Sequence, residues 1–134
     1  MRKIILDTNA YAALLAGDEA VLEELAAADR ILMSVVVLGE LYAGFKGGSR
    51  ERENVDLLDE FLRRPAVLTL DVTRATAEVF GVVKNRLRRA GTPIPINDVW
   101  IAAHAIETGS WVVTLDRHFA LVPGLLLWEG LAGA

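Results

Sequence analysis

The chain has 134 residues, a formal net charge of −4 and 53% hydrophobic residues. This length suits one domain, so we expect residues 1–134 to form a single unit with its own core. With no cysteine and only two histidines, the chain excludes disulfide bonds and thiol catalysis and disfavours a zinc site. The negative charge argues against coating of nucleic acid by bulk electrostatics, although it allows a nuclease with local positive charge.

Two further features concern location and assembly. No basic segment precedes an apolar stretch at the N-terminus, and no apolar run approaches the ~18 residues of a membrane span. We therefore expect neither a signal peptide nor a membrane segment, and a cytoplasmic location. The hydrophobic content is high for a lone small domain, which indicates a buried interface with a second copy or with a partner.

Apolar runs bounded by turn residues alternate with helical patterns. In chain order they predict a strand at 2–6, helices at 8–16 and 18–28, a strand at 30–33, helices at 34–46 and 49–63, a strand at 66–70, helices at 73–90 and 97–109, a strand at 111–115 and a last strand near 125–128. Strands alternating with helices predict an α/β fold with a mainly parallel sheet covered on both faces.

Two acids follow predicted strands. Asp7 comes directly after the apolar run Ile4-Ile5-Leu6, and Asp116 follows the run from Trp111 to Leu115. Ligands of open parallel sheets bind at the carboxyl ends of the strands, so these acids can share one crevice if their strands are neighbours. Each also has a purely structural explanation, as a turn residue or as the N-cap of a following helix.

Two more acids lie in predicted helices. Glu40 falls in the helix capped by Ser34, and its three- and four-residue neighbours predict a small apolar face on which an acid has no local structural role: Val36, Val37, Ala43 and Gly44. Asp98 lies in the first turn of a helix whose start the preceding prolines place near Asn97. The helix dipole alone would favour an acid there.

Together these four carboxylates predict a metal site. An unpaired carboxylate costs several kcal/mol to remove from water, so acids among apolar residues need a compensating partner. Four carboxylates in one pocket would repel one another, and their oxygens suit a hard divalent cation such as Mg²⁺ or Mn²⁺.

The motifs around these acids resemble those of the PIN domain, and more narrowly those of the VapC-like toxins of type II toxin–antitoxin pairs. The match spans almost the whole chain, with every motif in family order. The motifs are Asp7-Thr8-Asn9, Gly39-Glu40-Leu41, Asn97-Asp98-Val99-Trp100-Ile101-Ala102-Ala103-His104-Ala105 and Val113-Thr114-Leu115-Asp116-Arg117-His118-Phe119.

The resemblance implies a three-layer α/β/α sandwich and a metal-dependent endoribonuclease that cuts tRNA or rRNA. It implies a homodimer, and a small antitoxin that often places an Arg or Lys near the acidic pocket. By position, the resemblance makes four residues the catalytic, metal-binding acids: Asp7, Glu40, Asp98 and Asp116. Polar support falls to Thr8, Asn9 and Thr114.

The chemistry follows from the residue types. A divalent ion held by Asp7, Asp98 and Asp116 would activate water and neutralise charge on a phosphodiester. Glu40 would bind a second ion, bind through water or act as the base, and the sequence leaves these open. Thr114 lies two residues before Asp116, so on a continuous strand both side chains would share one face.

Outside the acids, the cluster Arg86, Arg88 and Arg89 ends the predicted helix 73–90, and we expect it to bind the RNA backbone. The helix dipole also favours cations there. We expect His104 to be a core or interface residue, whereas His118 is close enough to Asp116 to reach substrate. The three tryptophans are expected to pack rather than to stack on bases.

Two alternatives remain from the residues alone. Asp7 after a buried first strand could be the nucleophile of an aspartyl phosphotransferase, but such enzymes carry an Asp two positions later, where this chain has Asn9. The acidic pocket could also belong to a non-catalytic module that receives a basic peptide.

Overall fold

A four-stranded parallel sheet forms the centre of the molecule, in the order β3-β2-β1-β4. The computed structural model describes residues 1–128 and 130, so the remaining five positions of the predicted domain lie outside the described part. The strands are β1 (Lys3–Leu6), β2 (Arg30–Ser34), β3 (Val67–Leu70) and β4 (Trp111–Val113). The first and last strands of the sequence are therefore neighbours in the sheet.

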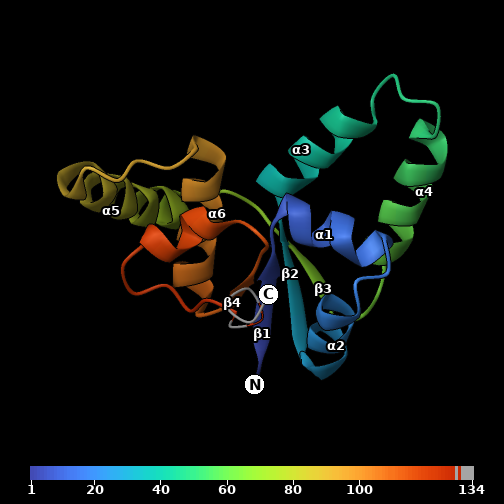
Figure 1. Ribbon diagram of the computed structural model, residues 1–134, viewed down its shortest axis with the longest axis horizontal. Coiled ribbons are helices and arrows are strands. Elements are labelled where there is room, and N and C mark those ends of the chain that lie inside the picture. Colours follow the sequence, from blue (N-terminus) through green and yellow to red (C-terminus); the bar gives the residue numbers. More distant parts are fainter. Residues whose placement is uncertain (129, 131–134) are drawn as a thin grey trace.

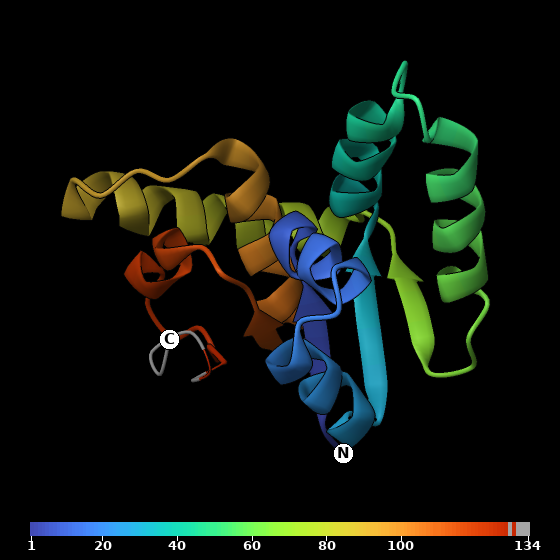
Figure 2. The same cartoon turned by 45° about the vertical axis from the view of Figure 1, so that its right-hand side comes forward.

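Helices cover both faces of this sheet (Figure 1). The helices are α1 (Thr8–Leu15), α2 (Glu19–Ala27), α3 (Val35–Phe45), α4 (Glu51–Leu62), α5 (Arg74–Ala90) and α6 (Ile96–Thr108), with a 3₁₀ turn η1 (Arg117–Leu121). Helices α5 and α6 lie on one side and α1, α2 and α4 on the other, while α3 continues beyond the end of β2. Figure 2 shows α3 and α4 standing side by side. This arrangement confirms the predicted α/β/α sandwich.

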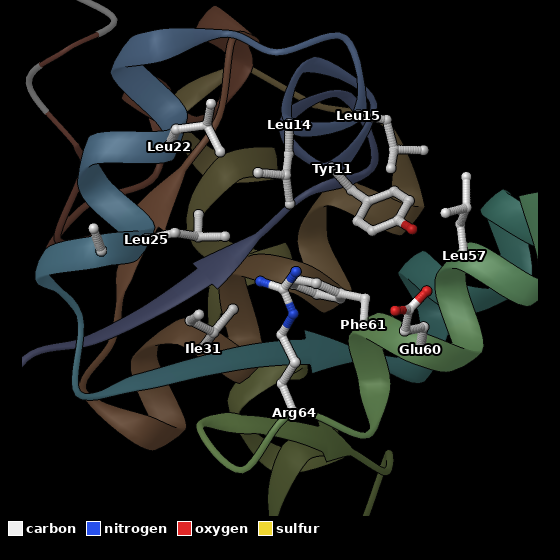
Figure 3. Close-up of a pocket in the computed structure, with 11 residues that line it drawn as sticks. Tyr11, Leu14, Leu15, Leu22, Leu25, Ile31, Leu57, Glu60, Phe61 and Arg64 are labelled. Carbon is white, nitrogen blue, oxygen red and sulfur yellow. The ribbon is translucent and has the colours of Figure 1, made fainter.

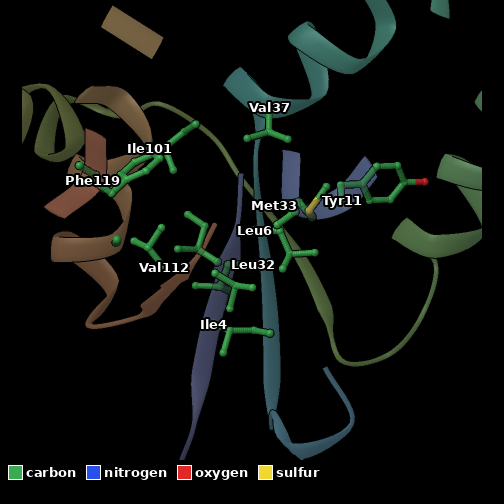
Figure 4. Packing of buried hydrophobic residues seen from close by; sticks show 14 of the residues in the cluster. Ile4, Leu6, Tyr11, Leu32, Met33, Val37, Ile101, Val112 and Phe119 are labelled. Atoms are coloured by element: carbon green, nitrogen blue, oxygen red, sulfur yellow. The ribbon is translucent and has the colours of Figure 1, made fainter. Parts of the chain in front are cut away.

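The core explains why the first strand reads as a continuous apolar run. Ile4, Ile5 and Leu6 are fully buried, because parallel sheets are covered on both faces. Figure 4 shows Ile4, Leu32 and Val112 of three strands packed at the centre of the sheet. Among the described residues, no helix is long and apolar enough to cross a membrane.

The predicted elements differ from the observed ones mainly at the C-terminal end. The predicted strand 111–115 stops at Val113, and the predicted strand near 125–128 is reduced to one parallel bridge between Val112 and Leu127. Helix α6 begins at Ile96 with Pro95 at the N-cap, one residue before the predicted start. The turn η1 is an element that the sequence pattern does not predict.

Candidate metal centre and active site

Asp7 sits at the carboxyl end of β1, where it also caps α1. Its Oδ1 accepts a hydrogen bond from the Ala10 N–H at 2.8 Å, and its Oδ2 accepts one from the Thr114 hydroxyl. Only 3% of the residue is exposed. Burial raises the pKa of Asp7 above its usual value, while the Thr114 and Ala10 hydrogen bonds oppose the rise. The carboxylate is thus fixed in orientation by one group from α1 and one from the end of β4.

Glu40 reaches the same place from α3. Its Oε1 accepts a hydrogen bond of 2.7 Å from the Thr8 hydroxyl, at the first residue of α1. Glu40 is half-buried, but Ala43 and Gly44 beyond it are exposed. The apolar face predicted around Glu40 is therefore covered only toward the sheet, where Val37 is fully buried, because α3 extends past the sheet's edge.

Asp98 lies in the first turn of α6, with 15% of its side chain exposed. Burial raises the pKa of its carboxyl to about 6, and the charges of Asp116, Asp7 and Glu40 add to that rise. His118 acts in the opposite direction and lowers the pKa, but three of the neighbouring charged groups are acids. The pocket therefore favours a cation.

Asp116 follows β4 and caps η1. Its Oδ1 accepts a hydrogen bond from the His118 N–H at 2.9 Å, and the Asp116 N–H donates to the Thr114 hydroxyl oxygen at 2.9 Å. The His118 Nδ1 lies 2.9 Å from Asp116 Oδ1 and 3.8 Å from Asp98 Oδ2. Thr114 thus links Asp7 to Asp116 although the strand ends at Val113, and the half-exposed His118 lies at the edge of the acidic group.

The four acids line one pocket of about 300 Å³. It is lined by Asp7, Thr8, Asn9, Glu40, Pro95, Ile96, Asn97, Asp98 and Asp116. Asp98, Asp116 and His118 also offer ligand atoms within 4.8 Å of one another. Carboxylate oxygens around an uncompensated negative pocket match the ligand preference of Mg²⁺ or Mn²⁺, so the residues fit the expected metal. We name this hollow the acidic pocket.

The sequence gives little indication that His118 lies beside Asp116, or that residues 95–97 line the pocket. A histidine in a loop is usually solvated, yet the turn η1 folds His118 back onto Asp116. Pro95, Ile96 and Asn97 line the pocket, and their motif carries no sign of this beyond proximity to Asp98.

Other predicted residues lie outside the acidic pocket. Arg86, Arg88 and Arg89 are exposed near the end of α5, which Figure 1 shows projecting away from the sheet. His104 is buried in the core, with its Nε2 3.0 Å from the Asp71 carbonyl oxygen. The Trp100 ring stacks on Phe80 with 3.8 Å between centroids, as expected for a packing residue.

This fold and this pocket agree with the comparison to known families. Residues 4–125 match the PIN domain, and the chain belongs to that family.

The individual proteins to which the chain is similar belong to a smaller group, the VapC ribonucleases. The chain is similar to Ribonuclease VapC2 of Rickettsia felis, 33% identical with 81% of each chain covered. It is also similar to the tRNA(fMet)-specific endonuclease VapC of Salmonella typhimurium, 34% identical with 72% of each covered. The structure resembles the DNA-bound VapBC complex of Salmonella typhimurium, with a TM-score of 0.84, 29% identity and 96% and 98% of the two chains covered.

Proposed function

We propose that this protein is a metal-dependent endoribonuclease and the toxin of a toxin–antitoxin pair. Its class, a VapC-type ribonuclease toxin, follows from the PIN domain and the VapC relatives. The observation that carries the metal-dependent mechanism is the convergence of four acids from β1, α3, α6 and the end of β4 on one pocket.

The roles of the side chains follow from their contacts. Asp7, Asp98 and Asp116 would hold the ion, and Glu40 lines the same pocket. The ion would supply Lewis acidity and neutralise charge on the phosphate. Thr114 holds Asp7 in one orientation. Thr8 holds one oxygen of Glu40, leaving the other oxygen to accept a proton from the attacking water.

The sequence beside Asp7 weighs against the phosphotransferase alternative. Such enzymes carry an Asp two positions later, where this chain has Asn9. A covalent phosphate trapped on Asp7 would favour that alternative instead.

The substrate we propose is cellular RNA, bound in part by Arg86, Arg88 and Arg89. Their clustering in a chain of net charge −4 supports this. Replacing all three with Gln should weaken RNA binding and flatten its salt dependence by roughly 0.7 for each phosphate that the variant no longer neutralises. If the triple variant and the wild type show equal RNA affinity and equal salt dependence in filter binding, these residues do not bind RNA.

An antitoxin is the partner we propose, and a second hollow supports a protein partner. This mainly apolar groove measures about 630 Å³. Figure 3 shows the side chains that line it, which are Tyr11, Leu14, Leu15, Leu22, Leu25, Ala26, Ile31, Leu57, Glu60, Phe61 and Arg64. Leu15, Leu22 and Leu57 are exposed along this groove. A protein segment would cover these groups.

We also propose a homodimer, supported by further exposed apolar side chains. Tyr42, Val82 and Ile96 are 41%, 51% and 51% exposed. A dimer interface would bury such side chains. Sedimentation that gives only monomer at micromolar concentration would contradict the dimer.

One experiment tests the enzymatic proposal directly. Purified protein is incubated with total cellular RNA and Mg²⁺, Mn²⁺ or chelator, beside an Asp98→Asn variant, and new RNA ends are mapped by sequencing. We expect discrete ends that require both metal and Asp98. Asp56 is exposed on α4, so the Asp56→Asn variant is the matched control and should cleave RNA as the wild type does. No new ends with folded protein would favour the acidic-pocket binding module instead.

A further inference from the structure

A third, smaller hollow lies beside the acidic pocket and has the opposite charge. It measures about 260 Å³ and is lined by Lys84, Leu87, Arg88, Pro93, Ile94 and Val99. The two hollows share one short segment. Pro93, Ile94 and Val99 line the smaller one, whereas the residues between them, 95–98, line the acidic pocket. The two hollows therefore adjoin along this segment.

The floor of this hollow is apolar and its rim is cationic. Leu87, Ile94 and Val99 are 2%, 7% and 0% exposed, so they form a packed floor. Lys84 is half-buried and Arg88 is exposed at the rim. Such a combination matches a nucleotide, whose base has a flat apolar face and whose phosphate is an anion.

The cations of the rim are not used elsewhere in the described part of the chain. Neither Lys84 nor Arg88 forms an ion pair there, and Arg88 makes only a 3.1 Å hydrogen bond to the Asn85 side chain. The helix dipole explains Arg88 in the last turn of α5, but Lys84 lies before that turn. The helix dipole therefore accounts for the position of Arg88 but not for that of Lys84.

We infer that this hollow is a subsite for one unpaired nucleotide adjacent to the cleaved bond, with the base on Pro93 and Ile94 and the phosphate on Lys84 and Arg88. This inference rests on the proposed ribonuclease function. A base reaches such a floor only when it has left its stack, so the subsite selects single-stranded segments of RNA. It also offsets the repulsion between RNA and the acidic pocket.

The test separates binding from cleavage. Short unpaired RNA oligonucleotides, each with one abasic position, are titrated against the full chain in chelator at low salt by fluorescence anisotropy. One abasic position should weaken binding on the order of tenfold, and it should flank the bond that is cut when metal is added. Ile94→Ala should remove that penalty. If Ile94→Ala unfolds, the abasic scan of the wild type still tests the subsite.

Charge is tested with single substitutions. Lys84→Met, which keeps the aliphatic stem, and Arg88→Gln should each reduce the salt slope of binding by about 0.7. Arg74→Gln, on the same helix and exposed at the opposite end, is the matched control and should leave binding unchanged.

Distinct outcomes overturn the two proposals. The subsite is wrong if no abasic position matters, if Ile94→Ala leaves the penalty in place, or if Arg74→Gln weakens binding as much as Lys84→Met. It is also wrong if these substitutions change only the sedimentation of the protein, which would assign the hollow to a second copy. Binding with the expected pattern but no cleavage in metal would overturn the ribonuclease and leave the hollow as a nucleotide-binding site only.

Discussion

Asp7 shows how one side chain serves the fold and the candidate site together. One oxygen caps α1 through the Ala10 N–H, and the other accepts from Thr114 beyond β4. A structural explanation of Asp7 as an N-cap therefore does not compete with a functional one. The cap fixes where the carboxylate points, which a metal ligand requires.

Thr114 is the residue at which we expect this dual role to be measurable. Thr114→Val keeps the shape but leaves Asp7 Oδ2 without its donor and the Asp116 N–H without its acceptor. We expect a decrease of about 1–3 kcal/mol in the free energy of unfolding, measured by urea denaturation. Thr114→Ser keeps both hydrogen bonds and should cost less than half as much, and equal decreases would contradict the role of the hydroxyl.

Asp98 gives a prediction about pH. Its pKa is raised in the folded state, from 3.8 to about 6, so the fold favours the protonated form. The resulting stabilisation is present below pH 3.8 and is lost as the pH rises through about 6. In chelator, Asp98→Asn should therefore stabilise the protein at pH 7.5 by on the order of 1–3 kcal/mol, and by much less at pH 4.5.

Urea unfolding at a series of pH values checks this. Asp56→Asn on the exposed face of α4 should change stability little at either pH. A destabilising Asp98→Asn at pH 7.5 would mean that the carboxylate is compensated in the metal-free protein.

At the scale of elements, the glycines give a pair of opposite predictions. Gly109 ends α6 with φ of 66°, a left-handed conformation, so Gly109→Ala should destabilise by ~1 kcal/mol. Gly81 lies within α5, and nothing lies within 4 Å of a Cβ added there. Gly81→Ala should therefore stabilise by roughly 0.5–1 kcal/mol. Thermal unfolding of both variants checks the pair, and the same sign for both would contradict it.

The elements were predictable where local pattern and tertiary structure agree. The run Ile4-Ile5-Leu6 predicted a buried strand because a parallel strand covered on both faces is apolar at every position. The C-terminal part was harder. The 111–115 run ends early because Thr114 binds the Asp116 N–H instead of continuing the strand, a choice made by tertiary structure that periodicity does not contain.

The candidate site was likewise predictable from local motifs, but not where it depends on tertiary structure. The order of the strands decides whether Asp7 and Asp116 lie in the same pocket, and β1 and β4 are neighbours. The sequence predicts that the two acids share a crevice if their strands are neighbours, but it does not predict the strand order. The contact of His118 with Asp116 depends on η1, which has no amphipathic pattern of its own. The cationic hollow is built from α5, a loop and α6, so no single motif carries it.

At the scale of the whole molecule, a bound ion should couple to stability. Mn²⁺ or Mg²⁺ at 100 times its dissociation constant should stabilise the wild type by about 2.7 kcal/mol, because it binds only the folded state. Asp98→Asn should respond much less. Thermal unfolding with metal, with NaCl of equal ionic strength and with chelator checks this, and an equal shift of both proteins would place the ion elsewhere.

The hydrogen bond between Asp7 and Thr114 joins residues 107 positions apart, and this has a consequence during synthesis on the ribosome. Asp7 emerges early, but Thr114 emerges only 107 residues later. The pocket of a nascent chain therefore lacks one wall until β4 and Asp116 have left the ribosome, since closing so long a loop must await the last strand of the sheet. The topology thus delays nuclease activity until the whole sheet has been synthesised and paired.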